Sequence, residues 1–454
     1  MKYNVALFSL FASVALALPA VNTGTQKRAV VASPTTDTKP LKFDNVTQFT
    51  GYLEDEKNDT HLFYWFFESR SKPSTDPIVI WFSGGPGGAS IEEAFDIGPA
   101  VVARKNPQTL EFTTSSKALS WNNFANLLFI DQPYNVGFSF SKTPVKDSKK
   151  AAHDIHASLT AFFKKFPQYS KQPVHLTGSS FAGHWIPAFA SEILTHNDKT
   201  INLKSVSIGN GFTDPLTQWG SNPAMACGKG GYPSLAASVC KGITDKWPTC
   251  EAKTKACYAD VTNAAVCKDA YYFCFDNLVE PVSAGGTNAY DIRKTDDFDA
   301  EGDPKYIGFI NAMDYLGQPE NAKAIGAHKK EDFVDLDLDT LDAFRASGDV
   351  TAPYHQLIPD IVKQIPVLVY AGDADFICNW IGVKQWMEDL KWDGKTKFNQ
   401  AELKPYTLNG KEVGKIKGAN GLTFVKVAAA GHQTSLDQPE VMVALMKGFL
   451  NGKL

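Results

Sequence analysis

Short apolar runs recur along the chain, and each run is bounded by glycine, proline, asparagine or aspartate. Continuous apolar runs of this length, without alternating polar positions, are typical of strands that are buried on both faces, as in a parallel sheet. We expect strands at 78–82, 127–130, 174–177, 206–208, 367–370 and 424–427.

Helical periodicity occupies much of the sequence between these runs. Apolar side chains from Ile155 to Phe166 recur at helical spacing and end just before a proline. A second helix is expected from Pro439 through Leu450, and a third over 185–194. Strands that alternate with helices predict an α/β fold with a mostly parallel central sheet.

The region from about 213 to 345 interrupts this alternation. It holds six of the seven cysteines, between Cys227 and Cys274, and no clear buried strand. An even cluster of cysteines in a secreted chain indicates a disulfide framework, for which six cysteines allow fifteen connectivities. We therefore interpret this region as a cap or insertion that disulfides hold together.

The N-terminal residues predict passage through the secretory pathway. A positively charged start is followed by an apolar run over 5–18 that is too short to span a membrane comfortably, so 1–20 is interpreted as a signal peptide rather than an anchor helix. The dibasic pair at 27–28 suggests a short pro-segment over 21–28, followed by a catalytic domain over 29–454. The chain is expected outside the cell or in a vacuole-like compartment, with glycosylation sequons at Asn45 and Asn58.

Composition and charge exclude several classes of function. The 454 residues are 43% hydrophobic and carry a formal net charge of −4, which becomes about −7 without the three basic residues of 1–28. No basic run is left to bind phosphates, so no nucleic-acid partner is expected. No metal or other cofactor is expected either, because the cysteines lack paired C-x-x-C spacing and the acids at 335, 337 and 339 lack the glycine and terminal acid of a calcium loop.

A serine with small neighbours follows the apolar run at 174–177. Ser180 has Gly178 two residues before it and Ala182 two residues after it, and a helical pattern follows. This is the context of a nucleophile elbow, the strained strand-to-helix turn that exposes a serine hydroxyl. Ser179 has the larger Thr177 and Phe181 at those offsets, so Ser180 is the candidate nucleophile.

Two further sites follow in the order that this kind of fold uses. The run at 367–370 ends in Asp373 and Asp375, and the run at 424–427 ends in a small-residue loop with His432. A histidine there can take the serine proton while an aspartate orients its ring. The glycine-rich segment 83–88 would supply an oxyanion donor from Gly85, with Phe181 as the second donor, and no Gly-Lys-Ser/Thr follows to make it a phosphate loop.

The sequence resembles the serine carboxypeptidases of the carboxypeptidase Y type over nearly the whole mature chain. Matching segments include WFSGGPG at 81–87, DQP at 131–133 and GSSFAGH at 178–184. The other matching segments are 49–53, 120–122, 137–139, 208–211, 290–293, 372–380, 431–432 and 437–440.

The resemblance implies an α/β-hydrolase core with a helical, disulfide-bonded insertion. It also implies that Asp375, rather than Asp373, completes the triad and that Cys378 is a free thiol beside the substrate. The disulfides it implies are Cys227–Cys240, Cys250–Cys274 and Cys257–Cys267.

The chain departs from the family where a free carboxylate would be bound. The family uses an asparagine and two glutamates that share a proton, whereas Ser83, Asp96 and Ser179 stand at those positions here. Gly88 replaces a family cysteine, so one disulfide between core and insertion should be missing. Carboxylate capture would then depend on hydroxyls, backbone amides such as that of Gly84, and a protonated Asp96.

The resulting hypothesis is a serine carboxypeptidase that acts on peptide or protein C-termini through an acyl-enzyme on Ser180. Phe181 and Gln433 are expected to line the pockets on either side of the scissile bond. One alternative is an acyltransferase or esterase on the same scaffold, because the carboxylate site is altered. A second is a binding protein without catalysis. Side-chain preference, pH optimum and oligomeric state stay open.

Overall fold

Six adjacent parallel strands form the centre of the main sheet in the computed structural model, which describes residues 30–106, 109–196, 199–295, 310–327, 329–330 and 332–454. Their spatial order is β8-β5-β10-β11-β12-β15, and every neighbouring pair is parallel. They are β5 (Ile78–Phe82), β8 (Asn126–Ile130), β10 (Val174–Ser179), β11 (Leu203–Gly209), β12 (Val367–Gly372) and β15 (Leu422–Val427). Each contains one of the six apolar runs, which confirms the predicted sheet.

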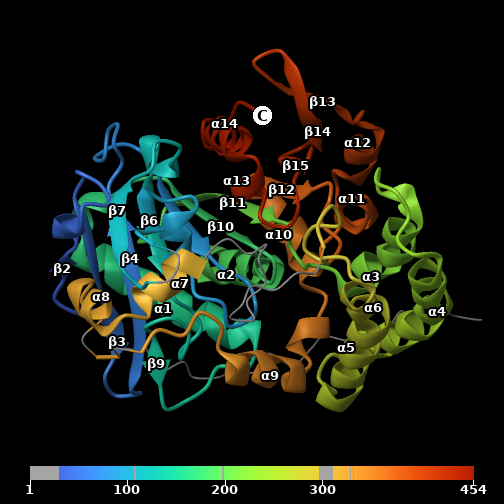
Figure 1. Cartoon of the computed structure of the whole chain (residues 1–454), viewed down its shortest axis with the longest axis horizontal. Coiled ribbons are helices and arrows are strands. Elements are labelled where there is room, and N and C mark those ends of the chain that lie inside the picture. The colour runs from blue at the N-terminus through green and yellow to red at the C-terminus, as the bar shows by residue number, and fades with distance from the viewer. Residues whose placement is uncertain (1–29, 107–108, 197–198, 296–309, 328, 331) are drawn as a thin grey trace, which may run out of the picture.

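Antiparallel strands extend the sheet on both sides (Figure 1). These strands were not predicted from the sequence. β4 is buried along its whole length, whereas β13 and β14 at the opposite edge are partly exposed and more polar. The added strands are β1 (Val31–Ala32), β2 (Thr36–Asp37), β3 (Gln48–Asp55), β4 (Thr60–Phe67), β9 (Phe140–Ser141), β13 (Lys404–Leu408) and β14 (Lys411–Ala419). A separate hairpin consists of β6 (Ala100–Arg104) and β7 (Phe112–Ser116).

Helices bury both faces of the parallel strands. Ile80 and Phe82 of β5 pack in one core cluster with α1 (Ser148–Lys165) and α2 (Ala182–His196), while Val79 and Trp81 pack in a second cluster with α14 (Pro439–Leu450). Alternate side chains of one strand therefore enter two cores, which is why the strand sequence is apolar throughout. The three helices expected from periodicity are α1, α2 and α14. Further core helices are α10 (Ile358–Val362), α11 (Trp380–Asp389), α12 (Lys395–Gln400) and α13 (Thr434–Asp437).

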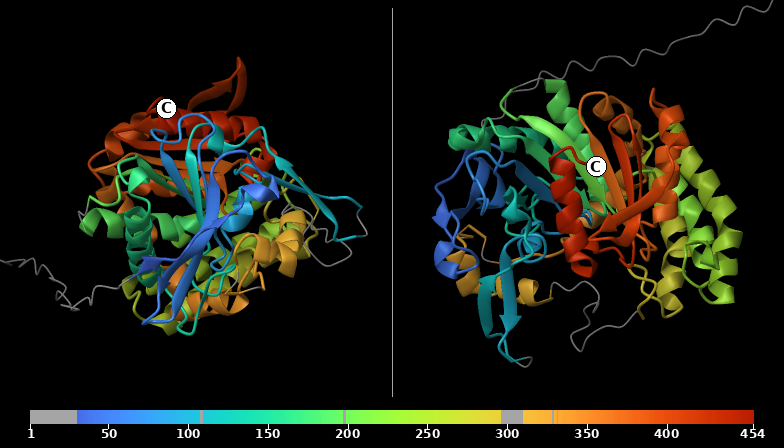
Figure 2. Two further views of the ribbon diagram at one scale, coloured as in Figure 1. Left: turned by 90° about the vertical axis from the view of Figure 1, so that its left-hand side faces the viewer. Right: turned by 90° about the horizontal axis from the view of Figure 1, so that it is seen from above.

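The segment between β11 and β12 is helical in its described part, which contains no named strand. Figures 1 and 2 show α4 and α5 packed side by side at the edge of the core. The cysteine pairs are Cys227–Cys240, Cys250–Cys274 and Cys257–Cys267, and Cys378 is unbonded. The helices are α3 (Pro215–Ala224), α4 (Ala237–Ala259), α5 (Ala264–Leu278), α6 (Glu280–Ala284), α7 (Ile310–Leu316), α8 (Pro319–Ala324) and α9 (Leu338–Ser347).

The predicted signal peptide and pro-segment lie outside the described residues. Among the helices that the structure describes, none has the length and apolar character needed to cross a bilayer. The two sequons do lie in described segments, and the side chains of Asn45 and Asn58 are exposed.

Candidate active site

Ser180 lies on a strained turn between β10 and α2. Its φ is +62°, in the left-handed region that residues with a β-carbon seldom adopt. Its backbone N–H donates to the carbonyls of Gly209 and Asn210, each at 3.1 Å. A β-carbon on Gly178 would lie 2.1 Å from the carbonyl oxygen of Phe82, so the turn has no room for a side chain there. This is the geometry of a nucleophile elbow.

Asp375 and His432 form a buried hydrogen-bonded pair at the ends of β12 and β15. The Asp375 Oδ2 lies 2.9 Å from Nδ1 of His432 and accepts a hydrogen bond from the Asn210 side-chain amide at 2.7 Å. Asp373 instead accepts from the hydroxyl of Tyr232 at 2.8 Å. The structure thus brings Asp375, and not Asp373, to the histidine. Asn210 therefore orients the Asp375 carboxylate. Its segment, 208–211, was recognised from the sequence only as one that matches the family, and this contact was not predicted.

Ser180 and His432 line the same cavity, which has a volume of about 550 Å³. It opens at the carboxyl ends of the parallel strands, because the segments after β5, β10, β12 and β15 all contribute to its wall. The wall contains the following residues predicted to form the site: Ser83, Gly84, Gly85, Ser179, Ser180, Phe181, Cys378, His432 and Gln433.

The glycine-rich segment after β5 lies against the nucleophile. A β-carbon on Gly84 would be 2.5 Å from Cβ of Ser180 and 2.7 Å from the backbone nitrogen of Phe181. Gly85 has a φ of +105°, which favours glycine. The backbone of Gly84 therefore lies against both Ser180 and the backbone nitrogen of Phe181, and Gly85 is the next residue along this segment.

Two carboxyl groups that sequence analysis did not select also line the cavity. Glu92 and Glu93 lie on a short 3₁₀ helix, η2 (Ile91–Phe95). The Glu93 side chain is 4% exposed, and its Oε2 has no hydrogen-bond partner among the described residues. Burial raises the pKa of Glu93 well above its usual range, and the neighbouring carboxylates of Asp96 and Glu92 raise it further. Glu93 is thereby disposed to keep its proton.

Asp96 lies behind this wall rather than in it. It is 1% exposed and is not among the residues that line the cavity. Its Oδ2 accepts from the hydroxyl of Ser435 at 2.5 Å, and its Oδ1 lies 3.5 Å from Nζ of Lys117. Burial raises the pKa of Asp96, while Lys117 opposes that shift. Asp96 can influence Glu93 but not contact a ligand in the cavity.

Cys378 and Phe181 occupy the wall beside the catalytic candidates. One ligand atom each from Cys378, Asp375 and His432 lies within 4.8 Å of the others. Burial, and then the Asp375 carboxylate, raise the pKa of the Cys378 thiol well above its usual range. Phe181 is 3% exposed, and its ring stacks on His184 at a centroid distance of 4.3 Å. It therefore packs in the core as well as bordering the cavity.

The region between β11 and β12 closes the other side of the cavity. Tyr271 and Phe275 reach it from α5, and Leu341 and Arg345 from α9. The Arg345 Nε donates to the Tyr271 hydroxyl at 3.1 Å, which joins the two helices at the wall. Residues far apart in the sequence thus determine the shape of this side.

A parallel sheet with a serine on an elbow after β10, an aspartate after β12 and a histidine after β15 defines the α/β-hydrolase class. The family model described as serine carboxypeptidase matches residues 36–452. The chain therefore belongs to the serine carboxypeptidase family.

Known proteins of high similarity agree with this assignment. Carboxypeptidase Y homolog A of Neurospora crassa is 44% identical over 421 residues, which cover 92% of this chain and 74% of that protein. The homolog of the same name from Uncinocarpus reesii is 44% identical over 416 residues, covering 90% and 75%. The crystal structure of Kex1(delta)p, a prohormone-processing carboxypeptidase from Saccharomyces cerevisiae, has a TM-score of 0.75 at 25% identity and covers 92% of this chain and 94% of that one.

The chain is accordingly a serine carboxypeptidase that acts on peptides. These similarities do not favour the alternative of an acyltransferase or esterase, nor that of a protein without catalysis.

Proposed function

We propose that the chain removes C-terminal residues through an acyl-enzyme on Ser180. His432 takes the proton from Ser180 Oγ as the oxygen attacks the scissile carbonyl, and returns it to the departing amine. Asp375 orients the imidazole and stabilises its charged form, and the backbone N–H groups of Gly85 and Phe181 bind the oxyanion. Water then attacks the acyl-enzyme with His432 again as base. The observation that carries the proposal is the buried Asp375–His432 hydrogen bond beside a serine at φ +62° in one cavity.

We further propose that Glu93 binds the terminal carboxylate of the substrate. An ionised glutamate in this position would repel a carboxylate, whereas a protonated one donates a hydrogen bond to it. Its burial and its neighbours Asp96 and Glu92 support the protonated form. In this assignment Asp96 keeps the proton on Glu93 and does not itself bind the substrate.

Ser83 is positioned to donate a second hydrogen bond to that carboxylate. Its Oγ accepts from the indole N–H of Trp81 at 3.1 Å, and its backbone N–H donates to the hydroxyl of Ser90 at 3.0 Å. The first contact orients the Ser83 hydroxyl at the wall of the cavity and the second fixes its backbone, and both leave the hydroxyl proton to donate.

Glu93→Gln is the variant that tests this assignment. The wild type should cleave a blocked dipeptide with a free C-terminus in strong preference to its amide, with a KM that rises from pH 4 to pH 8 as Glu93 loses its proton. Glutamine donates a hydrogen bond at every pH, so the variant should keep the preference but lose most of the pH dependence of KM.

Glu92→Gln, one residue away, keeps the titrating Glu93 and is the matched control. Its KM should still rise with pH, but from a lower pH, because one of the carboxylates that raise the pKa of Glu93 is gone. An unchanged profile in Glu93→Gln would show that Glu93 does not hold the carboxylate. Equal wild-type rates on the free and amidated dipeptides would instead contradict the whole carboxylate site. Those two failures are distinguishable in one set of assays.

The proposal also includes entry into the secretory pathway, with delivery outside the cell or to a vacuole-like compartment. The apolar N-terminus, the three disulfides and the exposed sequons at Asn45 and Asn58 support it. We propose that both asparagines carry glycans and that residues 21–28 are removed after the signal peptide.

A further inference from the structure

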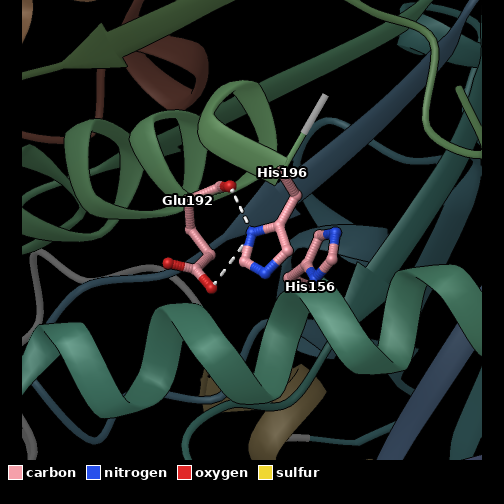
Figure 3. Close-up of side chains that lie close together, drawn as sticks. All are labelled: His156, Glu192 and His196. Atoms are coloured by element: carbon pink, nitrogen blue, oxygen red, sulfur yellow. Dashed lines mark hydrogen bonds and ion pairs between the residues drawn. The ribbon is translucent and has the colours of Figure 1, made fainter. Parts of the chain in front are cut away.

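A second cluster of ligand-type side chains lies outside the catalytic cavity, between α1 and α2. His156 projects from α1, and Glu192 and His196 project from α2 (Figure 3). One ligand atom from each of the three lies within 4.8 Å of the others. We propose that these residues form a binding site for a divalent transition-metal ion of the zinc class.

The spacing of the residues places all three on one side of the helix pair. Glu192 and His196 are four residues apart on α2, so they lie on the same face of that helix. The two imidazole rings of His156 and His196 stack across the gap between the helices, with centroids 4.2 Å apart and planes 27° from parallel (Figure 3). Packing of α1 against α2 fixes this juxtaposition.

Hydrogen bonds already orient the side chains that would bind the ion. The His196 Nδ1 lies 2.9 Å from the backbone oxygen of Glu192 and 3.4 Å from its carboxylate Oε1. The same Oε1 lies 2.5 Å from Nδ1 of His153, one turn before His156 on α1. The Glu192 side chain is only 16% exposed, so its carboxylate lies partly buried among imidazoles. Hydrogen bonds of this kind to the ligating side chains orient metal ligands in proteins.

The chemistry of the donor set selects the class of metal. Imidazole nitrogen suits zinc, copper and nickel, whereas calcium and magnesium prefer sites made of oxygen alone. In zinc sites, nitrogen–metal bonds of about 2.0–2.1 Å place neighbouring ligand atoms about 3.3 Å apart. Small rotations of two partly exposed histidines would bring the present atoms to that spacing, and water would complete the coordination.

Zinc bound at this site would affect the stability of the enzyme and not its catalysis. His196 ends α2, and Ala182 at its other end follows the elbow, about 21 Å away at the rise of an α-helix. An ion held by both helices would join α1 to the end of α2 that lies far from the cavity. Zinc should therefore raise the thermal stability of the folded chain and leave its peptidase activity unchanged through this site.

Zinc chloride titrated into chelator-treated full-length protein is the direct test. We expect the melting temperature to rise by about 3 °C at a hundredfold excess of zinc over the dissociation constant. His156→Ala and His196→Ala should each weaken zinc binding at least tenfold, measured by isothermal titration calorimetry. His153→Ala removes a hydrogen-bond partner of Glu192 rather than a ligand, so it should weaken zinc binding less than either ligand variant does.

Peptidase activity measured in parallel separates this site from the catalytic cavity, where zinc could also bind Cys378 and His432 and inhibit. The metal-free His156→Ala and His196→Ala proteins should be as active as the wild type, which shows that they are folded. A zinc response in the wild type that persists at full strength in His196→Ala would overturn the proposal. So would the absence of any stabilisation by zinc, or a loss of affinity in His153→Ala as large as in the other two variants.

Discussion

Gly84 shows how the absence of a single side chain serves the catalytic cavity. Its α-carbon faces the nucleophile so closely that an added β-carbon would lie 2.9 Å from Oγ of Ser180. In the proposed mechanism, that volume holds the scissile carbonyl and its oxyanion. The residue at 84 is thus constrained by its neighbour 96 positions later, and not by its own backbone conformation, because its φ lies outside the left-handed region.

Gly84→Ala should lower kcat/KM by more than a hundredfold, since the new methyl group collides with Ser180 Cβ and with the backbone of Phe181. Gly242→Ala in α4 is the matched control, because a β-carbon added there would have no other atom within 4 Å. The control should keep full activity and gain slightly in stability. Steady-state kinetics of both variants test this prediction. Near-wild-type activity of Gly84→Ala would contradict the proposed position of the oxyanion beside Gly84.

At the scale of elements, two disulfides join α4 to α5, and they differ in how near they lie to the cavity wall. Cys257–Cys267 and Cys250–Cys274 both link α4 to α5. Only Cys274 lies next to a residue of the cavity wall, Phe275. Removing either bridge gives the unfolded chain more freedom and lowers the free energy of unfolding by about 2–3 kcal/mol. Only the loss of Cys250–Cys274 should also disturb the cavity wall.

The variant with Cys257→Ala and Cys267→Ala should melt about 3 °C below the wild type and keep its KM within about twofold. The variant with Cys250→Ala and Cys274→Ala should lose similar stability and show a several-fold higher KM. Thermal melts and peptide kinetics of the two variants give the comparison. Equal KM values in both would show that the bridge at Cys274 does not support the cavity wall.

At the scale of the whole molecule, buried titratable groups set the pH at which the fold is most stable. Burial raises the pKa of Asp131 to about 7 and that of Asp349 to about 6, and raises that of Glu93 as well. Such carboxyls stabilise the fold while protonated, and that contribution is lost as the pH rises through their folded pKa. Burial lowers the pKa of His175 and of His184 to about 4, so their contribution is lost as the pH falls from about 6.5 toward 4.

The raised carboxyls outnumber the lowered histidines, so the melting temperature should be higher at pH 5 than at pH 7.5. Asp349→Asn should reduce this difference, because the folded chain then no longer holds that proton. Asp360→Asn, at a side chain that is 83% exposed, should leave the difference unchanged. Differential scanning calorimetry across pH 4–8 measures the effect, and a melting temperature that rises steadily to pH 8 would contradict it.

Much of the fold could be predicted from the sequence because its strands are buried on both faces. The six parallel strands and the helices α1, α2 and α14 follow from local apolar patterns, and all were predicted. The hairpin of β13 and β14 was missed, since its strands mix polar and apolar residues at a partly exposed edge. The long β4 was missed although its apolar run is continuous.

Some residues of the site could likewise be predicted from the sequence, and others could not. The elbow glycine and the order of serine, aspartate and histidine are local signals at strand ends, so Ser180, His432 and the pair Asp373 and Asp375 could be named from them. The family resemblance then selected Asp375. Family positions pointed to Asp96, whereas tertiary structure buries that residue behind the wall and places Glu92 and Glu93 in it.

The sequence by itself therefore determined which parallel strands form and what stands at their ends, because burial on two faces and tight turns leave local patterns. Only the tertiary structure decided which carboxyl groups face the cavity and which histidines of α1 and α2 meet. Those outcomes depend on contacts between segments far apart in the chain, and no local pattern records such contacts.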